Sequence, residues 1–592
     1  MTEKAAAQPL PTWNLDDLYP GRDSRELARD FERVATEAKE FRQSFEGKVG
    51  ALDGDALAGA IATFEEIEET LGRIASYASL VFAGNMSDPE IAQFHQSAQE
   101  KLTDISSDLI FFTLEINRIE EDRMNSLLAS SGTLKHYEPW IRDTRVFRPH
   151  QLSDEIEHLL HERYITGSAA WSRLFDETMA DMRVTMGRKE LPIEGALNFL
   201  SDKDPKKREA AAHALAKAFK DKIRLFALIT NTLAKDKAID DKQRGYSSPT
   251  AFRHLSNYVE EEVVEALASA VKDAYPRLSH RYYALKAKWF GVDKLNYWDR
   301  NAPLPGDTDR KVSWKQAKKI VLSAYGAFSP DMAEIAGQFF EKSWIDAPLR
   351  PGKAPGAFSA STVPSVHPYV LLNYQGRTRD VMTLAHELGH GVHQVLAGPQ
   401  GALMSHTPLT LAETASVFGE MLTFQSLLRS ETDPTRKRFM LANKVEDMLN
   451  TVVRQIAFYE FEKCVHTERR NAELTPDQIG KYWMATQEAS LGPAFRFDPE
   501  YQTYWCYIPH FIHSPFYVYA YAFGDCLVNS LYAVYQGAEA GFQDKYMDLL
   551  RAGGTKRHKE LLAPFGLDAS DPAFWSKGLG VIESMIDQLA AD

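Results

Sequence analysis

Two histidines four residues apart, His386 and His390, lie in the apolar segment RDVMTLAHELGHGVHQVL at residues 379–396. Residues at this spacing lie about one turn apart on the same face of an α-helix, so both imidazoles can reach one metal ion. Glu387 is rotated from His386 by about 100°. It therefore stays out of the ligand pair and can accept a proton from a water that the ion activates. The pattern predicts a hydrolytic zinc centre.

A tetrahedral catalytic zinc needs a third protein ligand and one position left for water. The next strongly helical segment, residues 408–428, carries Glu413, which we predict to be that ligand. Glu420 lies two turns further along the same face and is a candidate to orient a ligand histidine through a hydrogen bond. His393 extends the histidine face, but a site with three protein ligands does not require it. We therefore assign His393 a supporting role beside the ligands.

A second cluster of polar aromatic groups lies in YWCYIPHFIHSPFYVYAY, residues 504–521. Buried phenols and imidazoles need hydrogen-bond partners that a purely apolar core does not supply, so the segment suits the wall of an active site. A tyrosine hydroxyl or a protonated histidine could stabilise the oxyanion that forms when water attacks an amide carbonyl. The candidates are His510, His513, Tyr517 and Tyr519.

Around these residues the sequence predicts a mainly helical fold. Apolar residues recur every three to four positions, which is typical of helices that bury one face. After residue 345, proline, glycine and two short β-prone runs predict a small sheet directly before the 379–396 helix. The predicted helices are residues 58–71, 94–112, 154–160, 207–226, 261–274, 314–328, 379–396 and 408–428, and the predicted strands are residues 357–362 and 369–374.

Two earlier breaks in the helical pattern bear on domain organisation. Residues 179–191 alternate partly around a glycine-containing turn and predict a β-hairpin that marks a lobe boundary. Residues 296–309 collect Asn, Pro, Gly and Asp, which predicts a surface connection between helices. We accordingly expect an N-terminal helical lobe over residues 1–190 and a catalytic domain, with the small sheet, over residues 191–592.

Composition excludes several classes of protein. The chain has 592 residues, of which 44% are hydrophobic and 25% charged, so it is too long for one small binding module and typical of a folded protein. The net charge of −14 argues against a nucleic-acid or anionic-membrane partner. Three cysteines without a CxxC pair, no basic–apolar leader and no apolar run of about 18 residues predict a cytoplasmic protein that does not enter a membrane.

Several motifs together resemble the oligoendopeptidase F branch of the thimet oligopeptidase-like zinc metallopeptidases. The resemblance spans nearly the whole chain, and its specific motifs lie between residues 356 and 524. They are GAF at 356–358, PSVHPYV at 364–370, NY at 373–374, the HELGHGVHQ region at 379–394, LAETASVFGE at 411–420 and PHFIHSPFYVYAYAFG at 509–524, with WNLDDLYP at 13–20 as a similar opening.

The resemblance implies a mainly α-helical, two-lobed bowl around a deep channel, with one zinc ion per chain on the channel wall. Such a channel admits short unstructured peptides and excludes folded proteins. By position, His386, His390 and Glu413 would bind zinc, and Glu387 would be the general base. The resemblance leaves open which histidine of the 510–513 pair, and which tyrosine of the 517–519 pair, faces the scissile carbonyl.

The resemblance also implies a strand that pairs with the substrate backbone, a form of β-augmentation. One departure from the branch lies in this strand, because residue 359 is a serine where a cysteine is frequent. The implied substrate-binding residues are Gly356, Ala357, Phe358 and Ser359, with Tyr521 from the aromatic segment.

The predicted function is zinc-dependent hydrolysis of internal peptide bonds in oligopeptides. One alternative is an exopeptidase of the same chemistry, a carboxypeptidase or dipeptidyl carboxypeptidase, in which a basic residue captures the terminal carboxylate. The other is a peptide-binding protein without turnover. The retention of Glu387 and of all three predicted ligands favours an enzyme.

Overall fold

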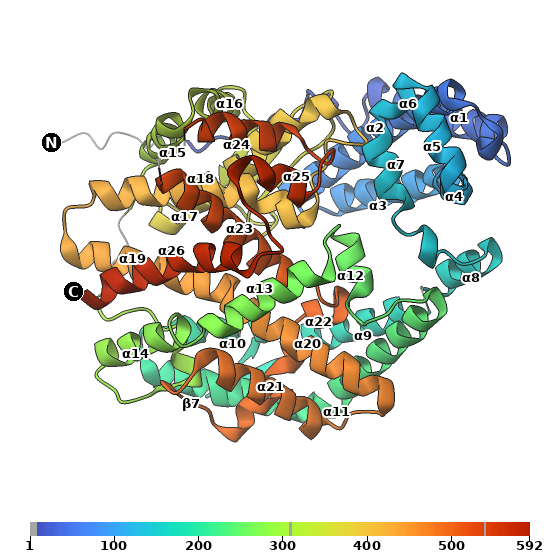
Figure 1. Ribbon diagram of the computed structural model, residues 1–592. Helices are drawn as coiled ribbons and strands as arrows, with labels where there is room; N and C mark the ends of the chain where they lie inside the picture. The colour runs from blue at the N-terminus through green and yellow to red at the C-terminus, as the bar shows by residue number, and fades with distance from the viewer. Residues whose placement is uncertain (1–8, 165, 307–310, 538–539, 592) are drawn as a thin grey trace. The chain divides into compact units, whose positions relative to one another are not determined.

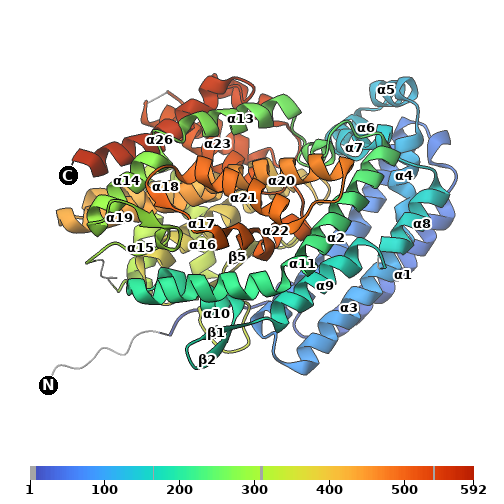
Figure 2. The same cartoon turned by 90° about the horizontal axis from the view of Figure 1, so that it is seen from below.

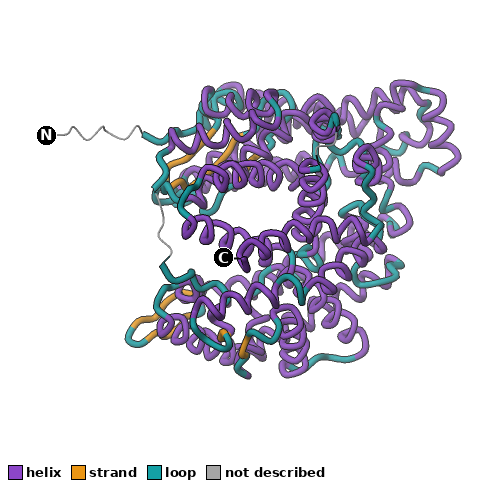
Figure 3. Tube along the Cα trace, turned by 60° about the vertical axis from the view of Figure 1, so that its left-hand side comes forward, coloured by secondary structure: helices purple, strands orange, loops and turns teal. Residues whose placement is uncertain are grey.

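The structure, a computed structural model, describes residues 9–164, 166–306, 311–537 and 540–591, and helices predominate in it (Figure 3). Contacts divide the chain into two compact units. Unit 1 comprises Met1–Arg148, Asp309–Ser430 and Ala538–Gly566, and unit 2 comprises Pro149–Thr308, Glu431–Gly537 and Leu567–Asp592. The predicted mainly helical fold with small sheets is confirmed. The domain boundary at residue 190 stays a prediction.

Unit 1 begins with helices that pack side by side (Figure 2). Ser24, Asp53 and Asp88 cap the first three of them, and each accepts a hydrogen bond from a first-turn amide. The helices of unit 1 are α1 (Arg25–Phe45), α2 (Gly54–Gly84), α3 (Pro89–Ser107), α4 (Ile110–Arg118), α5 (Glu121–Ser130), α6 (Gly132–His136), α7 (Glu138–Arg145), α15 (Trp314–Phe328), α16 (Pro330–Glu341), α17 (Thr378–Ala397), α18 (Leu409–Ser430), α24 (Phe542–Arg551) and α25 (His558–Leu562).

Unit 1 also contains a three-stranded sheet in the order β4-β6-β5. The central strand pairs in parallel with β4 and antiparallel with β5, so β5 is an edge strand among the strands that the structure describes. The buried ammonium of Lys353 donates hydrogen bonds to Asp346 Oδ1 (2.7 Å) and to the main-chain oxygen of Leu372 (2.6 Å), which ties β4 to β6. The strands are β4 (Ile345–Pro348), β5 (Phe358–Ala360) and β6 (Tyr369–Tyr374). Both predicted strands are present.

The sheet leads directly into α17, and the start of this helix is fixed by one carboxylate. Asp380 Oδ2 accepts hydrogen bonds from the backbone amides of Arg377 (2.9 Å) and Gln375 (2.7 Å). The helix ends at Ala397, and Gly398 and Pro399 follow it. The predicted apolar stripe of α17 is buried from Val381 to Val392. α18 packs along α17 (Figure 1).

Unit 2 is built on the long helix α11, with two small two-stranded sheets. Its helices are α8 (Asp154–Tyr164), α9 (Ser168–Asp181), α10 (Ile193–Asn198), α11 (Pro205–Arg244), α12 (Ala251–Ser256), α13 (Glu261–Ala274), α14 (Ser279–Phe290), α19 (Pro434–Thr451), α20 (Val453–Asn471), α21 (Pro476–Leu491), α22 (His510–His513), α23 (Tyr519–Gln536) and α26 (Pro572–Ala591). Its strands are β1 (Arg183–Met186), β2 (Lys189–Pro192), β3 (Leu295–Asn296) and β7 (Phe495–Arg496).

The predicted hairpin is present as β1 and β2, which pair antiparallel across Gly187, a residue with φ of +63°. The prediction of one helix over residues 94–112 is wrong in one respect. The segment is divided into two helices, because α3 ends at Ser107 and α4 begins at Ile110. No helix in the part of the chain that the structure describes is long and apolar enough to cross a membrane.

The predicted surface connection over residues 296–309 is also wrong in its first half. Tyr297, Trp298 and Asp299 are buried, and β3 pairs with β7 in this region. Asp299 accepts hydrogen bonds from the buried guanidinium of Arg208, at 2.8 Å and 3.0 Å. An aspartate that reads as a turn residue in sequence is thus the partner of a buried charge. Residues 307–309 lie outside the described residues.

Candidate metal centre

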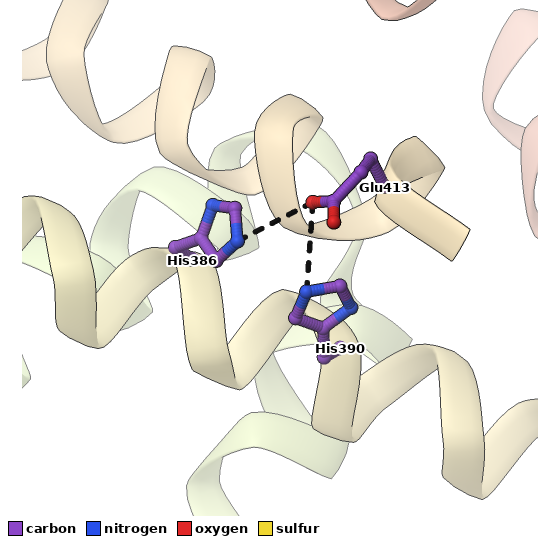
Figure 4. Close-up of side chains that lie close together, drawn as sticks. All are labelled: His386, His390 and Glu413. Carbon is purple, nitrogen blue, oxygen red and sulfur yellow. Dashed lines mark ion pairs between the residues drawn. The ribbon is translucent and has the colours of Figure 1, made fainter. Parts of the chain in front are cut away.

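The three predicted metal ligands lie together in unit 1 (Figure 4). α17 presents His386 and His390 from successive turns, and α18 presents Glu413 opposite them. Glu413 Oε2 lies 3.4 Å from His386 Nε2 and 3.6 Å from His390 Nε2. One ligand atom from each residue lies within 4.8 Å of the other two. α17 and α18 therefore bring two imidazole nitrogens and one carboxylate oxygen close enough together to bind a single metal ion.

These separations agree with the geometry of zinc. Zinc bonds of about 2.0–2.1 Å to nitrogen and oxygen, arranged as a tetrahedron, place two ligand atoms about 3.3 Å apart. Two histidines and one glutamate are also a donor set of catalytic zinc sites. The side chains of His386, His390 and Glu413 remain 27%, 19% and 26% exposed, so water can reach a fourth position. The residues present fit a catalytic zinc ion.

The electrostatics of the site favour a cation between these groups. Burial disfavours a charged His386, but hydrogen bonds to Glu413 and Glu420 outweigh it and raise its pKa to about 10. Burial similarly opposes the charge of Glu413, yet the two histidines lower the pKa of its carboxyl to about 2. For His390 burial dominates and lowers the pKa to about 4. The carboxylates of Glu413 and Glu420 thus stabilise a positive charge at this point of the site.

Glu387 is 7% exposed, and its position on α17 is rotated by about 100° from that of His386. Burial raises the pKa of its carboxyl to about 7, although the charge of His386 and a backbone hydrogen bond with Ser359 act in the opposite direction. A carboxyl group with a pKa near the working pH can both accept and return a proton. This is the property that a general base and acid requires.

Two tyrosines that the sequence analysis did not identify donate hydrogen bonds to main-chain oxygens of α17 and α18. The hydroxyl of Tyr325, on α15, donates a hydrogen bond to the main-chain oxygen of Ala385, directly before His386. The hydroxyl of Tyr546, on α24, donates to the main-chain oxygen of Thr414, directly after Glu413, at 2.9 Å. Both tyrosines are far from these residues in sequence, so no local signal could have identified them.

The predicted substrate strand is tied to the same helix. Ser359, in β5, donates a hydrogen bond from its hydroxyl to Gln394 Oε1 at 2.8 Å. Gly356 has a φ of +78° and no atom within 4 Å of where a Cβ would lie. Ala357 and Phe358 are half-buried, and the Phe358 ring contacts Trp13. The edge strand is therefore anchored to the metal-ligand helix at Ser359.

The two candidate supporting residues have different partners. Glu420 Oε2 lies 3.3 Å from His386 Nδ1, so Glu420 holds the ring from the side opposite Glu413. His393 Nε2 instead lies 3.2 Å from the hydroxyl of Thr407. Burial lowers the pKa of His393 to about 3, so its imidazole is neutral.

In unit 2 the structure brings three of the polar aromatic candidates together. His510 Nε2 lies 3.2 Å from the Tyr521 hydroxyl, and the Tyr517 ring stacks near His510 and contacts Tyr521. All three side chains are only partly buried. The residue before Tyr517, Phe516, has a φ of +61° and donates its backbone amide to the buried Glu462 at 2.9 Å. A bulky residue in this conformation is strained, so the contacts around Phe516 must stabilise it.

The other two candidates lie apart from this group. His513 Nε2 is 2.8 Å from Asp176 Oδ1. Tyr519 is fully buried, and its hydroxyl accepts a hydrogen bond from Asn257 Nδ2 at 2.8 Å and lies 3.2 Å from His254 Nδ1. The side chains of His513 and Tyr519 thus have partners of their own within unit 2.

In this helical fold, α17 carries the HELGH motif and faces Glu413 on α18, an arrangement typical of metallopeptidases. Comparisons with known proteins identify the peptidase family. The profile described as peptidase family M3 matches residues 198–581, and the one described as oligopeptidase F matches residues 115–183. The chain belongs to peptidase family M3. The resemblance to oligoendopeptidase F seen in the sequence is confirmed.

Relatives match over almost their whole length. Oligopeptidase PepF of Bacillus subtilis (strain 168) is 28% identical, covering 100% of this chain and 89% of its own. An oligoendopeptidase F homolog of Lactococcus lactis subsp. lactis (strain IL1403) is 25% identical, covering 98% and 96%.

Solved structures share the fold. The crystal structure of oligoendopeptidase-F from Enterococcus faecium is similar with a TM-score of 0.73 and 22% identity, covering 96% of this chain and 98% of that one. A Chlamydophila abortus protein reaches a TM-score of 0.87 at 22% identity, covering 98% of both chains.

Proposed function

We propose that this family M3 peptidase is a zinc-dependent endopeptidase that hydrolyses internal bonds of short, unstructured oligopeptides. The observation that carries the proposal is the convergence of His386, His390 and Glu413 on one point, with the buried Glu387 next to them in sequence. The printed names of the relatives, oligopeptidase and oligoendopeptidase, support the same class of substrate. One zinc ion per chain would satisfy the donor set.

A zinc ion held by the three ligands would supply Lewis acidity toward water and toward a peptide carbonyl. Glu387 accepts the proton of the attacking water and then delivers it to the leaving amine, for which its raised pKa suits it. Glu420 fixes the orientation of the His386 ring. In this proposal an extended peptide pairs with the edge of β5 at residues 356–359, where it replaces the hydrogen bonds that the main chain of Ser359 makes with Glu387 and Gln394.

For the oxyanion we propose His510 and Tyr517 as hydrogen-bond donors. The partly exposed group of His510, Tyr517 and Tyr521 has side chains that a substrate can reach. Tyr519 is buried with its hydroxyl already engaged, and His513 is paired with Asp176. These contacts favour His510 over His513 and Tyr517 over Tyr519 for the catalytic role, with Tyr521 orienting His510.

An exopeptidase of the same chemistry is the second candidate. Peptides blocked at both ends separate the two, because a carboxypeptidase or dipeptidyl carboxypeptidase needs a free terminal carboxylate. The zinc-loaded protein should cleave a doubly blocked peptide of about ten residues at an internal bond, identified by mass spectrometry of both fragments. Cleavage restricted to peptides with a free carboxyl end would favour the exopeptidase. A peptide-binding protein without turnover would cleave neither.

A further inference from the structure

A β-turn over residues 514–517 carries the proposed oxyanion donor Tyr517 within unit 2. The Tyr517 amide donates a hydrogen bond to the main-chain oxygen of Ser514 at 3.0 Å, which closes the turn. Pro515 occupies the second position of the turn, and Phe516, at the third, has a φ of +61°. Proline at the second position and a positive φ at the third are the pattern of a type II turn. Tyr517 is therefore the last residue of a type II turn.

The local sequence favours a different turn. Serine at the first position and proline at the second are typical of type I turns, in which the third residue has a φ of about −90°. Type II turns favour glycine or asparagine at the third position, because other side chains are strained at positive φ. The two types differ chiefly in the orientation of the peptide group between the second and third residues. Contacts from elsewhere in the chain must therefore hold the peptide group between Pro515 and Phe516 in its observed orientation.

Two side chains bind this peptide group, one at each end. Arg253, on α12, donates a hydrogen bond from its Nε to the main-chain oxygen of Pro515 at 3.1 Å. The amide of Phe516 donates to Oε1 of Glu462, on α20, at 2.9 Å. In the type I orientation the N–H and C=O groups would exchange sides, and both hydrogen bonds would be lost. Arg253 and Glu462 therefore stabilise the type II turn against the type I turn.

The residues on either side of Tyr517 are also held by their surroundings. Phe516 is fully buried, and the centroid of its ring lies 4.8 Å from that of His466. Two residues after Tyr517, the buried hydroxyl of Tyr519 accepts a hydrogen bond from Asn257 at 2.8 Å. The backbone before and after Tyr517 is thus fixed by contacts within unit 2.

We propose that Arg253 and Glu462 are positioning residues that hold the Tyr517 hydroxyl where peptide hydrolysis requires it. The inference rests on the proposed function, in which Tyr517 donates a hydrogen bond to the oxyanion. Rotation of the peptide group before Phe516 would change the direction in which the chain enters Tyr517. A displacement of about 1 Å in a reacting group can cost about 10²-fold in rate. Glu462 is 1% exposed, and the burial of a carboxyl group beside a strained backbone is typical of functional sites.

The first test is steady-state kinetics with a doubly blocked oligopeptide. Glu462→Leu removes the acceptor and Arg253→Met removes the donor, so each should lower kcat by about 10- to 100-fold while KM stays within about threefold. Glu462→Gln should keep kcat within about threefold of the wild-type value, because its amide oxygen accepts the same hydrogen bond. Arg253→Met, at a partly exposed position, decides the question if Glu462→Leu does not fold. Unchanged kcat in a folded Glu462→Leu or Arg253→Met protein, or an equal loss in Glu462→Gln, would overturn the proposal.

A double-mutant cycle separates positioning from general destabilisation. If both residues act through Tyr517, adding Glu462→Leu or Arg253→Met to Tyr517→Phe should lower kcat further by less than about threefold. Asn231→Leu is the matched control, since Asn231 is 3% exposed in unit 2 and its Oδ1 accepts a hydrogen bond from the Leu474 amide at 2.8 Å. It should lower the melting temperature and leave kcat per folded chain unchanged. A full further loss in the double variants, or an equal loss of kcat in the control, would contradict a positioning role.

Crystal structures of the wild-type protein, Glu462→Leu and Arg253→Met keep this role separable from the peptidase function. The φ of Phe516 should be positive in the wild-type protein. It should become negative in at least one of the two variants, with the Tyr517 hydroxyl displaced. A positive φ and an unmoved hydroxyl in both variants would overturn the proposal. Absence of cleavage by the zinc-loaded wild-type protein would count against the proposed function, while these structures would still decide whether the two residues hold the turn.

Discussion

The main-chain oxygen of Ala415 in α18 lies so close to Gly389 in α17 that it leaves no room for a side chain at Gly389. A Cβ added at Gly389 would lie 2.5 Å from that oxygen and 2.6 Å from the Cα of Ser416. Gly389 is the residue before the ligand His390, and Ala415 follows Glu413 by two positions. The absence of a side chain at Gly389 in the HELGH motif thus lets the two helices that carry the predicted metal ligands approach closely.

The close approach predicts the effect of Gly389→Ala. The new methyl group meets backbone atoms that cannot rotate away, so we expect a loss of about 1–3 kcal/mol in the free energy of unfolding. Zinc affinity should fall as well, because Glu413 moves away from the histidines. Denaturant unfolding and zinc titration measure the two effects. Gly59→Ala is the matched control, since Gly59 lies in α2 with no atom within 4 Å of the new methyl. Equal behaviour of the two variants would contradict the account.

The contact between Glu420 and His386 predicts weaker metal binding in Glu420→Gln. A carboxylate that holds the free ring nitrogen of a metal-ligating histidine orients the ring and increases its basicity. We expect zinc affinity to fall by about 10- to 100-fold, measured by competition with a chromogenic chelator. Glu334→Gln, at an exposed position of α16, should keep the wild-type affinity. Retained affinity in Glu420→Gln would remove Glu420 from the metal site.

Two tyrosine variants separate catalysis from packing in unit 2. Tyr517→Phe should lower kcat by about 10²-fold with little change in KM, because a lost oxyanion donor affects the transition state. Tyr519→Phe should instead lower the melting temperature, since the buried Asn257 and His254 lose a hydrogen-bond partner. Its kcat should remain within a few-fold of the wild-type value, by the same reasoning. The reverse pattern, with kcat lost in Tyr519→Phe alone, would exchange the two roles.

The buried carboxyl of Glu462 predicts a pH dependence of stability. Burial raises its pKa from the ordinary value of 4.5 to about 8, while the Phe516 amide and Arg253 act to lower it. Its Oε2 is buried without a hydrogen-bond partner among the described residues. The folded protein therefore keeps a proton that the unfolded chain releases above pH 4.5. From this group the free energy of unfolding falls as pH rises from about 4.5 to about 8, by at most about 1.4 kcal/mol per pH unit.

The variant Glu462→Gln should remove this contribution. Melting temperatures of the variant should decline less than those of the wild-type protein between pH 6 and pH 8, since its side chain does not titrate. Glu473→Gln, which changes an exposed glutamate just beyond α20, is the control and should follow the wild-type curve. Parallel curves for wild-type and Glu462→Gln protein would show that the group is ionised in the folded state.

The sequence could predict the ligand cluster because its members are set by local periodicity. His386 and His390 share a face by helical spacing, and Glu413 follows on the next helix. The same spacing says nothing about how closely two helices approach, so neither the contact at Gly389 nor the bonds from Tyr325 and Tyr546 could be inferred. These depend on segments that are distant in the chain.

The prediction of a surface connection over residues 296–309 was wrong where a residue type that is common in turns is instead the hydrogen-bond partner of a buried charge. Asp299 lies in a segment rich in turn residues, yet it pairs with Arg208 inside unit 2. The aromatic run at residues 504–521 shows a similar limit. Residue types alone could not separate Tyr517 from Tyr519, because the difference lies in Asn257 and His254, which belong to another part of the chain.

The most direct test of the account is a paired measurement of bound zinc and turnover in wild-type protein and Glu387→Gln. Zinc per chain is determined by elemental analysis, and hydrolysis of a doubly blocked oligopeptide is followed by mass spectrometry. The account predicts close to one zinc ion per chain in both proteins. Internal cleavage should be present in the wild-type protein and lowered by at least about 10³-fold in the variant. Undiminished cleavage by Glu387→Gln, or cleavage that persists after a chelator has removed the zinc, would contradict it.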